Sequence, residues 1–175
     1  MLMSRSLNNL RQLILIAHNV RSTHNVGSLF RTAEGLGVDE LILSGYTPYP
    51  KEKNDVRLSY MADKLEGQIN KTALGAQFSL KWRHTEDIAG VIAAFKKQSF
   101  KVIALEQDKK SRVITDLDYG DKIALIIGNE LTGLAGSVLG LCDQIIEIPM
   151  FGRKESYNVV QAAAMALFYL RLTSF

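Results

Sequence analysis

The stretch Ile148-Pro-Met-Phe-Gly-Arg-Lys-Glu-Ser-Tyr-Asn-Val-Val160 runs directly into Gln-Ala-Ala-Ala-Met-Ala-Leu-Phe-Tyr-Leu170. An apolar strand end and a turn that contains proline and glycine lead into a helix whose start carries Ser156 and Asn158. Beyond these residues the helix is apolar almost all the way round, and such a helix is normally buried on several sides. We therefore expect the polar groups at its mouth to serve a site rather than to face bulk water.

The rest of the chain alternates between two kinds of segment. Apolar runs typical of buried strands occur at 13–17, 41–43, 101–105, 122–127 and 144–148. Helical spacing is clearest at 26–36 and at 85–98, where Thr85 is a plausible cap. Further helices are expected near 56–65, between the later strands and after the last one. This alternation predicts an α/β fold with a mostly parallel sheet and helices on both faces.

Length and composition limit the class of protein. The 175 residues, 47% of them apolar, suffice for one domain, which we place at 13–175 after a short N-terminal arm at 1–12. The single cysteine, Cys142, cannot form an internal disulfide, and the longest apolar run, 162–170, is too short to span a bilayer. We therefore expect a cytoplasmic protein without a membrane partner or signal peptide.

The charge distribution is more informative than the net charge of +3. The first 33 residues contain no acid and four arginines, namely Arg5, Arg11, Arg21 and Arg31. The segment from 45 to 85 contains seven Lys and Arg residues and four acidic residues. Four aromatic residues are interspersed among them: Tyr46, Tyr49, Tyr60 and Trp82. Basic groups attract phosphates and flat rings stack on unpaired bases, so the mixture suits RNA. The alternative is a solvated loop with some core aromatics.

Three segments that follow predicted strands have unusual polar or glycine content. They span residues 18–33, 128–134 and 148–160. In parallel sheets, ligands bind in loops beyond the carboxyl ends of the strands. We therefore expect the three segments to share one crevice.

The first of these segments offers an amide and a guanidinium around a helix start. Asn25 can cap the helix, and Gly27 lies one turn before Arg31 on the same face. A glycine there would leave room for a substrate to approach the guanidinium. The alternative is a capping residue followed by a surface arginine.

The second segment is a glycine turn that exposes backbone groups and one carboxylate, Glu130. It is not a phosphate-binding P-loop, because Leu134 and Ala135 follow Gly133 where that loop needs Lys and Ser or Thr. Exposed backbone can still bind an adenine edge or a ribose. Alternatively, Glu130 simply stabilises the N-terminus of a following helix.

The sequence lacks the motifs typical of metal sites, serine hydrolases and nicotinamide oxidoreductases. The histidines and Cys142 have no metal-ligand spacing, so no metal is expected. No G-x-S-x-G is present for a serine hydrolase, and no G-x-G-x-x-G follows a strand, which disfavours a nicotinamide oxidoreductase.

In order and spacing, the three segments resemble the motifs of the SpoU (TrmH-like) family of RNA ribose 2′-O-methyltransferases, in the SPOUT superfamily. The pattern N-x-G-x-x-x-R-T-A is met by Asn25, Gly27, Arg31, Thr32 and Ala33. The G-N-E-x-x-G-L loop is met from Gly128 to Leu134. The pattern I-P-M-x-G-x-x-x-S-x-N-V is met by Ile148, Pro149, Met150, Gly152, Ser156, Asn158 and Val159. Tyr157 and Val160 depart from the Leu and Ser usual at these places in the family.

The resemblance implies a deep trefoil knot in the C-terminal part of the sheet and a homodimer whose site is assembled from both chains. It also implies that S-adenosylmethionine is the cofactor. The residues expected to bind it are Leu105, Gly128, Ile148, Met150, Ser156 and Asn158.

The implied reaction is methyl transfer to a ribose 2′-hydroxyl of tRNA or rRNA, with tRNA favoured. Family proposals make the arginine matching Arg31 the base, but arginine stays protonated in proteins. We therefore expect Arg31 to clamp a phosphate and to stabilise the developing alkoxide. We expect Asn25 to orient Arg31, and Glu130 to orient either the arginine or a hydrogen-bond donor. Ser156 and Asn158 are expected to position the hydroxyl and the cofactor. The alternative is a non-catalytic knotted RNA-binding or assembly factor.

Overall fold

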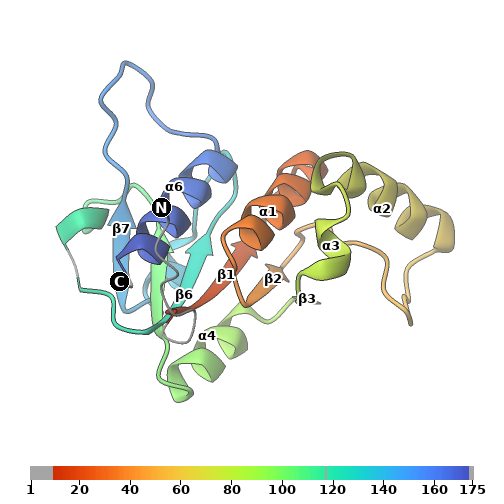
Figure 1. Ribbon diagram of the computed structural model, residues 1–175, viewed down its shortest axis with the longest axis horizontal. Helices are drawn as coiled ribbons and strands as arrows, with labels where there is room; N and C mark the ends of the chain where they lie inside the picture. The colour runs from red at the N-terminus through yellow and green to blue at the C-terminus, as the bar shows by residue number, and fades with distance from the viewer. Residues whose placement is uncertain (1–9, 117, 174–175) are drawn as a thin grey trace, which may run out of the picture.

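A seven-stranded parallel sheet forms the centre of the molecule (Figure 1). The computed structural model describes residues 10–116 and 118–173. The strands lie side by side in the order β3 (Trp82–Thr85), β2 (Glu40–Ser44), β1 (Gln12–His18), β6 (Lys122–Ile127), β4 (Lys101–Leu105), β7 (Gln144–Glu147) and β5 (Arg112–Val113). The five predicted strands are thus confirmed to within two residues at each end.

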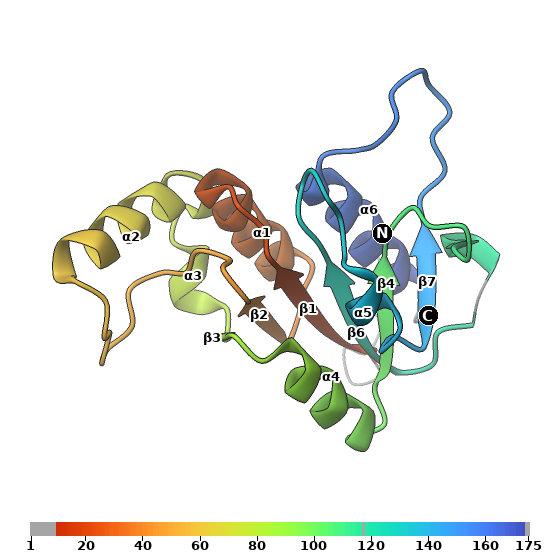
Figure 2. The ribbon, with the colours of Figure 1, turned by 180° about the vertical axis from the view of Figure 1, so that it is seen from behind.

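Helices cover both faces of the sheet, as predicted. On one face lie α1 (Thr23–Gly35), α2 (Ser59–Ala73), α3 (Ala76–Ser79) and α6 (Val159–Leu172), and on the other lie α4 (Ile88–Lys97) and α5 (Gly136–Leu139). A 3₁₀ turn at Ile114–Asp116 follows β5. In Figure 1, α1 and α6 lie in front of the sheet, and α2 lies beside α1 beyond the edge of the sheet. In Figure 2, α4 and α5 lie in front of the sheet. The trefoil knot implied by the resemblance stays a prediction.

Strand β1 shows why the two apolar layers form. Leu13 and Leu15 pack into the core beneath α1 and α6, whereas Ile14 and Ile16 pack into the core beneath α4. Successive strand residues point to opposite faces, so a strand covered on both sides must be apolar throughout. The central strands could therefore be recognised as continuous apolar runs.

The two edge strands of the sheet, β3 and β5, are not continuous apolar runs. Strands β3 and β5 were not among the predicted strands, and neither contains a buried residue. Arg83 and Arg112 interrupt them with charge. An edge strand has a neighbour on one side only, and charged side chains are common there. These strands are defined by pairing with β2 and β7 rather than by apolar periodicity.

Two predicted helix caps are wrong. Helix α4 begins at Ile88 because Asp87 Oδ1 accepts from the backbone N–H of Gly90 at 2.8 Å, whereas Thr85 ends β3. Helix α1 is capped by Ser22, whose hydroxyl accepts from the backbone N–H of Asn25 at 3.3 Å. Asn25 therefore sits in the first turn, and its side chain is available for other partners. The helix expected near 56–65 begins at Ser59 and continues to Ala73.

Gly27 marks the closest approach of α1 to α2. A Cβ atom there would lie 2.2 Å from both Ile69 O and Thr72 Oγ1. The Thr72 hydroxyl also donates to His24 O at 2.8 Å. The expectation that Gly27 leaves room for a substrate is therefore wrong, because the space belongs to α2.

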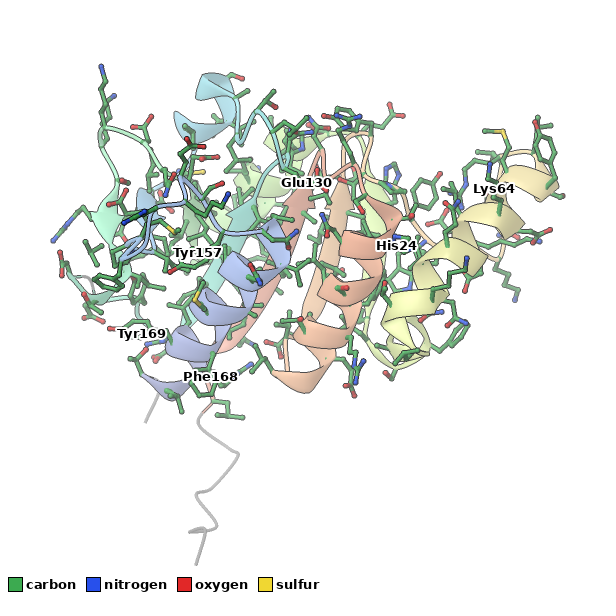
Figure 3. All side chains as sticks on the ribbon, turned by 90° about the horizontal axis from the view of Figure 1, so that it is seen from above. His24, Lys64, Glu130, Tyr157, Phe168 and Tyr169 are labelled. Atoms are coloured by element: carbon green, nitrogen blue, oxygen red, sulfur yellow. The ribbon has the colours of Figure 1, made fainter. Side chains whose placement is uncertain are left out.

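Helix α6 is buried on one side only. Ala163, Ala166, Leu167 and Leu170 are fully covered, but Met165, Phe168 and Leu172 are 37%, 54% and 53% exposed. These three residues recur at helical spacing and form an apolar stripe along the outer face, where Figure 3 shows Phe168. Within the described residues, none of the helices is long and apolar enough to cross a membrane.

Two arginines tie the start of β1 to the last turn of α6. Arg11, only 7% exposed, donates to Leu170 O at the end of α6. Arg171 in turn donates to Arg11 O at 2.7 Å and to Leu36 O at 3.1 Å. Arg11 is thus part of the domain packing rather than a free basic group. Arg5 and the rest of the predicted arm up to residue 9 lie outside the described residues.

Candidate active site

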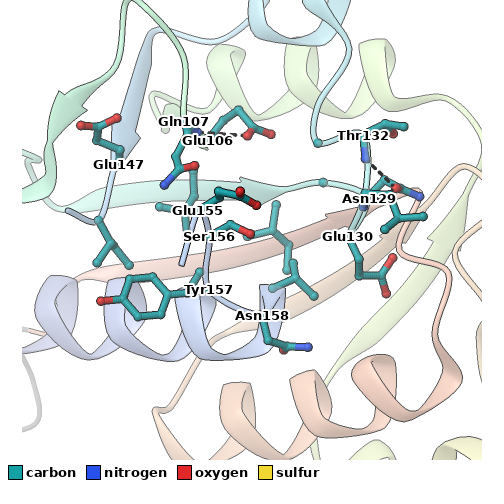
Figure 4. A pocket seen from close by; sticks show the side chains of 18 residues that line it. Glu106, Gln107, Asn129, Glu130, Thr132, Glu147, Glu155, Ser156, Tyr157 and Asn158 are labelled. Carbon is teal, nitrogen blue, oxygen red and sulfur yellow. Dashed lines mark hydrogen bonds between the residues drawn. The ribbon is translucent and has the colours of Figure 1, made fainter. Parts of the chain in front are cut away.

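A cavity of about 540 Å³ opens at the carboxyl ends of β4, β6 and β7 (Figure 4). Its lining comes from residues 105–107, 127–133, 147–148 and 155–159, together with Ala162. The second and third segments of the sequence analysis therefore do converge. Of the residues expected to bind a cofactor, Met150 is not in the lining, whereas the others are: Leu105, Gly128, Ile148, Ser156 and Asn158.

The loop after β6 folds back tightly on itself. A Cβ atom at Gly128 would lie 2.6 Å from the carbonyl carbon of Gly133, and Gly133 itself has a φ of +65°. The backbone groups of Asn129 and Gly133 pair across the turn at 3.0 and 3.3 Å. Both glycines are required here, one by close approach and one by its backbone conformation.

Two further side chains build this loop. Asn129, 8% exposed, accepts from the backbone N–H groups of Leu131 and Thr132 at 2.8 and 3.0 Å. Glu106 accepts from Leu134 N at 2.8 Å. Glu106 was not among the predicted site residues. The signal that could have identified it is its position as a carboxylate one residue past the predicted strand 101–105.

Glu130 lies against the start of α1. Its carboxylate accepts from the backbone N–H groups of Arg21 and Ser22 at 3.0 and 3.1 Å and from Asn25 Nδ2 at 2.8 Å. Burial acts to raise the pKa of Glu130, but these hydrogen bonds outweigh it and lower the pKa below its ordinary value. Glu130 is therefore an ionised acceptor at neutral pH, and it joins the first segment to the second.

Asn158 adds the third segment to this cluster. It caps α6, since its Oδ1 accepts from Val160 N at 2.8 Å. Its Nδ2 donates to Asn25 Oδ1 at 3.4 Å. A single chain of hydrogen bonds, from Glu130 through Asn25 to Asn158, thus links the three segments at the rim of the cavity.

The two remaining predicted catalytic residues, Ser156 and Arg31, lie outside this chain of hydrogen bonds. Ser156 is exposed in the loop before α6 and lines the cavity. Arg31 is exposed on α1, six residues past Asn25, which corresponds to about 9 Å along the helix. It lies outside the cavity lining, and its guanidinium makes no hydrogen bond or ion pair with the described residues. One chain alone does not bring Arg31 into the cluster.

The cavity has a marked acidic character. Four carboxylates line it, from Glu106, Glu130, Glu147 and Glu155, and its lining, all of it described, includes no Lys or Arg. In Figure 4, Glu130 and Glu147 lie at opposite ends. Apolar side chains such as Leu105, Ile127 and Ile148 complete the wall. This composition favours a ligand with positive charge and apolar surface over one that carries several phosphates.

The basic segment between 45 and 85 is less free than its composition suggests. Lys51 pairs with Asp63 at 2.7 Å, Arg57 pairs with Asp55, and Lys81 and Arg83 both pair with Glu40. Tyr49 is stacked between His84 and Arg57, and the Trp82 indole donates to Gln77 O at 3.0 Å. The exposed remainder comprises Lys53, Lys64, Lys71, Tyr46 and Tyr60; Figure 3 shows Lys64 projecting from α2.

Comparison with known proteins gives matches along most of the chain. It is 31% identical over 162 residues to the 23S rRNA (guanosine-2′-O-)-methyltransferase RlmB of Acinetobacter baylyi, covering 92% of this chain and 60% of that protein. It is 29% identical over 161 residues to a tRNA (guanosine(18)-2′-O)-methyltransferase of Aquifex aeolicus, covering 90% and 68%. The chain thus spans about two thirds or less of the length of these relatives.

Solved structures share the fold. The SpoU methyltransferase AviRb from Streptomyces viridochromogenes superposes with a TM-score of 0.76 at 23% identity, over 94% of this chain and 60% of that one. A second crystal structure of AviRb, in complex with the cofactor AdoMet, gives a TM-score of 0.74 at 24% identity, over 95% and 59%. The sequence model of the SpoU rRNA Methylase family matches residues 12–168. The chain therefore belongs to the SpoU rRNA Methylase family.

Proposed function

We propose that this protein is an S-adenosylmethionine-dependent RNA methyltransferase that modifies a ribose 2′-hydroxyl. The observation that carries the proposal is the hydrogen-bonded chain from Glu130 through Asn25 to Asn158 at the rim of an acidic cavity. Each of the three residues comes from a different part of the sequence, and each is a residue that the family motifs specify.

The cavity suits the proposed cofactor. S-adenosylmethionine supplies a methyl group on a positively charged sulfur, and it also carries an ammonium group, a carboxylate and an adenine ring, so its net charge is positive. The four carboxylates match the positive charges, and Leu105, Ile127 and Ile148 offer apolar surface for a ring. The backbone of residues 127–133, which lines the cavity, can contribute hydrogen bonds without adding charge. The proposed cofactor-binding residues are those predicted from the sequence that line the cavity.

The polar cluster would position the ribose. Asn158 has its oxygen committed to the cap of α6, so its amide nitrogen is the group that faces Asn25 and the incoming hydroxyl. Ser156 is exposed and can orient the same hydroxyl. Glu130, held ionised, fixes Asn25. Positioning of this kind is the main contribution that a protein can make to an in-line transfer.

Arg31 would act in a homodimer. It is exposed and stands apart from the cavity of its own chain, while the apolar stripe of Met165, Phe168 and Leu172 lies on α6, which packs beside α1. We propose that two chains pair through this stripe and that Arg31 of each chain completes the site of the other. There it would clamp a substrate phosphate and stabilise the developing alkoxide.

The substrate is proposed to be tRNA or rRNA, with tRNA favoured, in the cytoplasm. Support comes from the relatives, which are named as methyltransferases of 23S rRNA and of tRNA. Within this chain, the exposed cations Lys53, Lys64 and Lys71 on and beside α2 would contribute to RNA binding.

The test is methyl transfer from radiolabelled S-adenosylmethionine to bulk RNA from cells in which the gene has been deleted. The tRNA-sized and ribosomal fractions are assayed separately and then digested to nucleosides. We expect label in a 2′-O-methylated nucleoside of one fraction. Cofactor binding in calorimetry without any RNA labelling would instead favour the non-catalytic RNA-binding factor. Label on a base would contradict the ribose assignment.

A further inference from the structure

Tyr46 is an exposed aromatic residue held at the edge of the candidate active site. The residue is 61% exposed, and its phenol oxygen accepts a hydrogen bond from Asn129 Nδ2 at 2.9 Å. Asn129 immediately precedes Glu130 in the loop that lines the cavity. The ring is therefore anchored at its far end to the site while much of its surface stays open to solvent.

The backbone of Tyr46 is fixed as firmly as its hydroxyl. Its N–H donates to Asn19 Oδ1 at 3.1 Å, and Asn129 Nδ2 also donates to Asn19 O at 3.1 Å. Gly45, with a φ of +65°, brings the chain so close to Asn19 that a Cβ atom there would lie 2.1 Å from Asn19 Oδ1. Little conformational freedom remains to be lost when a ligand contacts the ring.

The surroundings of the ring suit a nucleotide. The hydrogen bond from Val20 N to Thr47 Oγ1, at 3.0 Å, holds the chain around residue 20 against the chain around residue 47. Arg21, which follows Val20, is exposed, and its backbone N–H binds Glu130. The Tyr46 hydroxyl and the Arg21 backbone thus bind neighbouring residues of the same loop, Asn129 and Glu130, so an exposed ring and an exposed cationic residue both lie beside that loop. Of the four aromatic residues noted between 45 and 85, Tyr46 is the one with a hydrogen bond to the loop that lines the cavity, whereas the Trp82 indole binds Gln77 and Tyr49 stacks on His84.

We propose that Tyr46 is a stacking platform for an unpaired nucleobase beside the ribose that is methylated. This inference rests on the proposed function and adds a specificity-determining residue to it. Flat aromatic side chains bind splayed-out bases by stacking, and the loss of one such contact weakens binding by roughly 5- to 150-fold. Tyr46 would therefore determine how well the RNA saturates the enzyme and not how the methyl donor binds.

The experiment compares Tyr46→Phe with Tyr46→Leu. Phenylalanine keeps the ring and removes the hydrogen bond to Asn129, whereas leucine removes the ring as well. The matched control is Phe78→Leu, which removes a still more exposed ring (78%) on α3. The measured quantities are the half-saturating concentration of the methylated RNA fraction, the rate at saturation and the affinity for S-adenosylmethionine.

We expect the leucine variant to need at least about fivefold more RNA for half-saturation, with unchanged cofactor affinity. The phenylalanine variant and the Phe78→Leu control should stay within about twofold of wild type in RNA saturation. If the phenylalanine variant needs as much additional RNA for half-saturation as the leucine variant, Tyr46 acts only through its hydrogen bond to Asn129, and the stacking role is wrong. An unchanged RNA requirement in the leucine variant contradicts it equally.

A second variant gives a readout that does not depend on turnover. Tyr46→Trp places an exposed indole at the site, and Trp82 is the only tryptophan already in the chain. Stacking on a base should quench the new fluorescence when RNA is added, relative to the wild-type protein. Absence of quenching with an RNA that binds overturns the inference. If the wild-type protein transfers no methyl group to RNA, the proposed function itself fails, which is a distinct result.

Discussion

Asn25 and Glu130, which stand 105 residues apart in the chain, are joined by a hydrogen bond of 2.8 Å. Because Asn25 donates to Glu130 through its nitrogen, its oxygen is left to accept from Asn158. The carboxylate therefore sets the orientation of an amide that touches both other motifs. This relationship turns three separate sequence motifs into one site.

Glu130→Gln should disturb this site strongly. Glutamine loses the ionised acceptor for Asn25 and for two backbone N–H groups, so we expect a loss of about 1–2 kcal/mol in the free energy of unfolding. Methyl transfer should fall by roughly tenfold or more. Urea unfolding and single-turnover labelling measure the two effects.

The stability difference between wild type and Glu130→Gln should depend on pH. The pKa of Glu130 is lowered from its ordinary value of 4.5, so wild type has its full advantage above that pH and loses it as the pH falls through the lowered value. Urea unfolding at pH 7 and at pH 3.5 tests this. An equal difference at both pH values would contradict the proposed hydrogen bonding.

Two substitutions at Asn158 separate its two roles. Asn158→Ala removes the cap of α6 and should cost about 1 kcal/mol of stability. Asn158→Asp keeps a capping oxygen but cannot donate to Asn25, so it should fold normally and still methylate poorly. Full activity in the aspartate variant would show that the contact with Asn25 is unimportant.

Gly27→Ala should destabilise the protein by about 1–3 kcal/mol, because the new methyl group meets the backbone of α2. Gly67→Ala is the matched control, since a Cβ atom at Gly67 meets nothing within 4 Å. There, alanine should stabilise α2 by about 0.5–1 kcal/mol. Thermal unfolding measures both effects, and an unchanged melting temperature in Gly27→Ala would contradict the packing of Gly27 against α2.

Phe168→Glu should prevent the proposed dimer, because it places a charge in the exposed apolar stripe of α6. Phe78→Glu introduces the same charge at an exposed ring outside that stripe and should leave the dimer intact. Sedimentation analysis measures the mass of each. A monomeric wild-type protein, or a dimeric Phe168→Glu variant, would rule out this interface.

Arg31→Lys tests whether the guanidinium is a clamp or a base. A clamp needs the planar fork of arginine, so lysine should lower single-turnover methylation by about tenfold or more at every pH. Strong rescue at high pH would argue for a base. Arg83→Lys, at an arginine that pairs with Glu40 at 3.2 Å, is the control and should stay active.

The interior of the fold could be predicted because a strand that is buried on both faces is apolar at nearly every position. Strands such as 101–105 and 122–127 are apolar at nearly every position, and α1 shows one apolar face. The edge strands β3 and β5 could not be predicted in this way, since half of their surroundings is solvent. The cap of α4 was misassigned because Thr85 and Asp87 both suit a helix start.

The members of the candidate site were predictable only in part, and the contacts between them were not predictable. Motif order placed Asn25, Glu130 and Asn158 together, and contacts between their side chains followed. Arg31 was grouped with them by sequence, yet it is exposed outside the cavity lining of its own chain. The roles of Glu106 and Tyr46 depend on which loops lie side by side, and no local pattern records that.

By itself, the sequence determined the α/β class, the positions of the buried strands and the three polar segments at their ends, because apolar periodicity and loop composition are local properties. Only the tertiary structure decided that Gly27 packs against α2, that four basic side chains are paired internally, and that one face of α6 stays uncovered. These outcomes depend on close approach between elements far apart in the chain. The same is true of the stretch from Ile148 to Leu170, whose polar start acquires its partners only when Asn158 reaches Asn25.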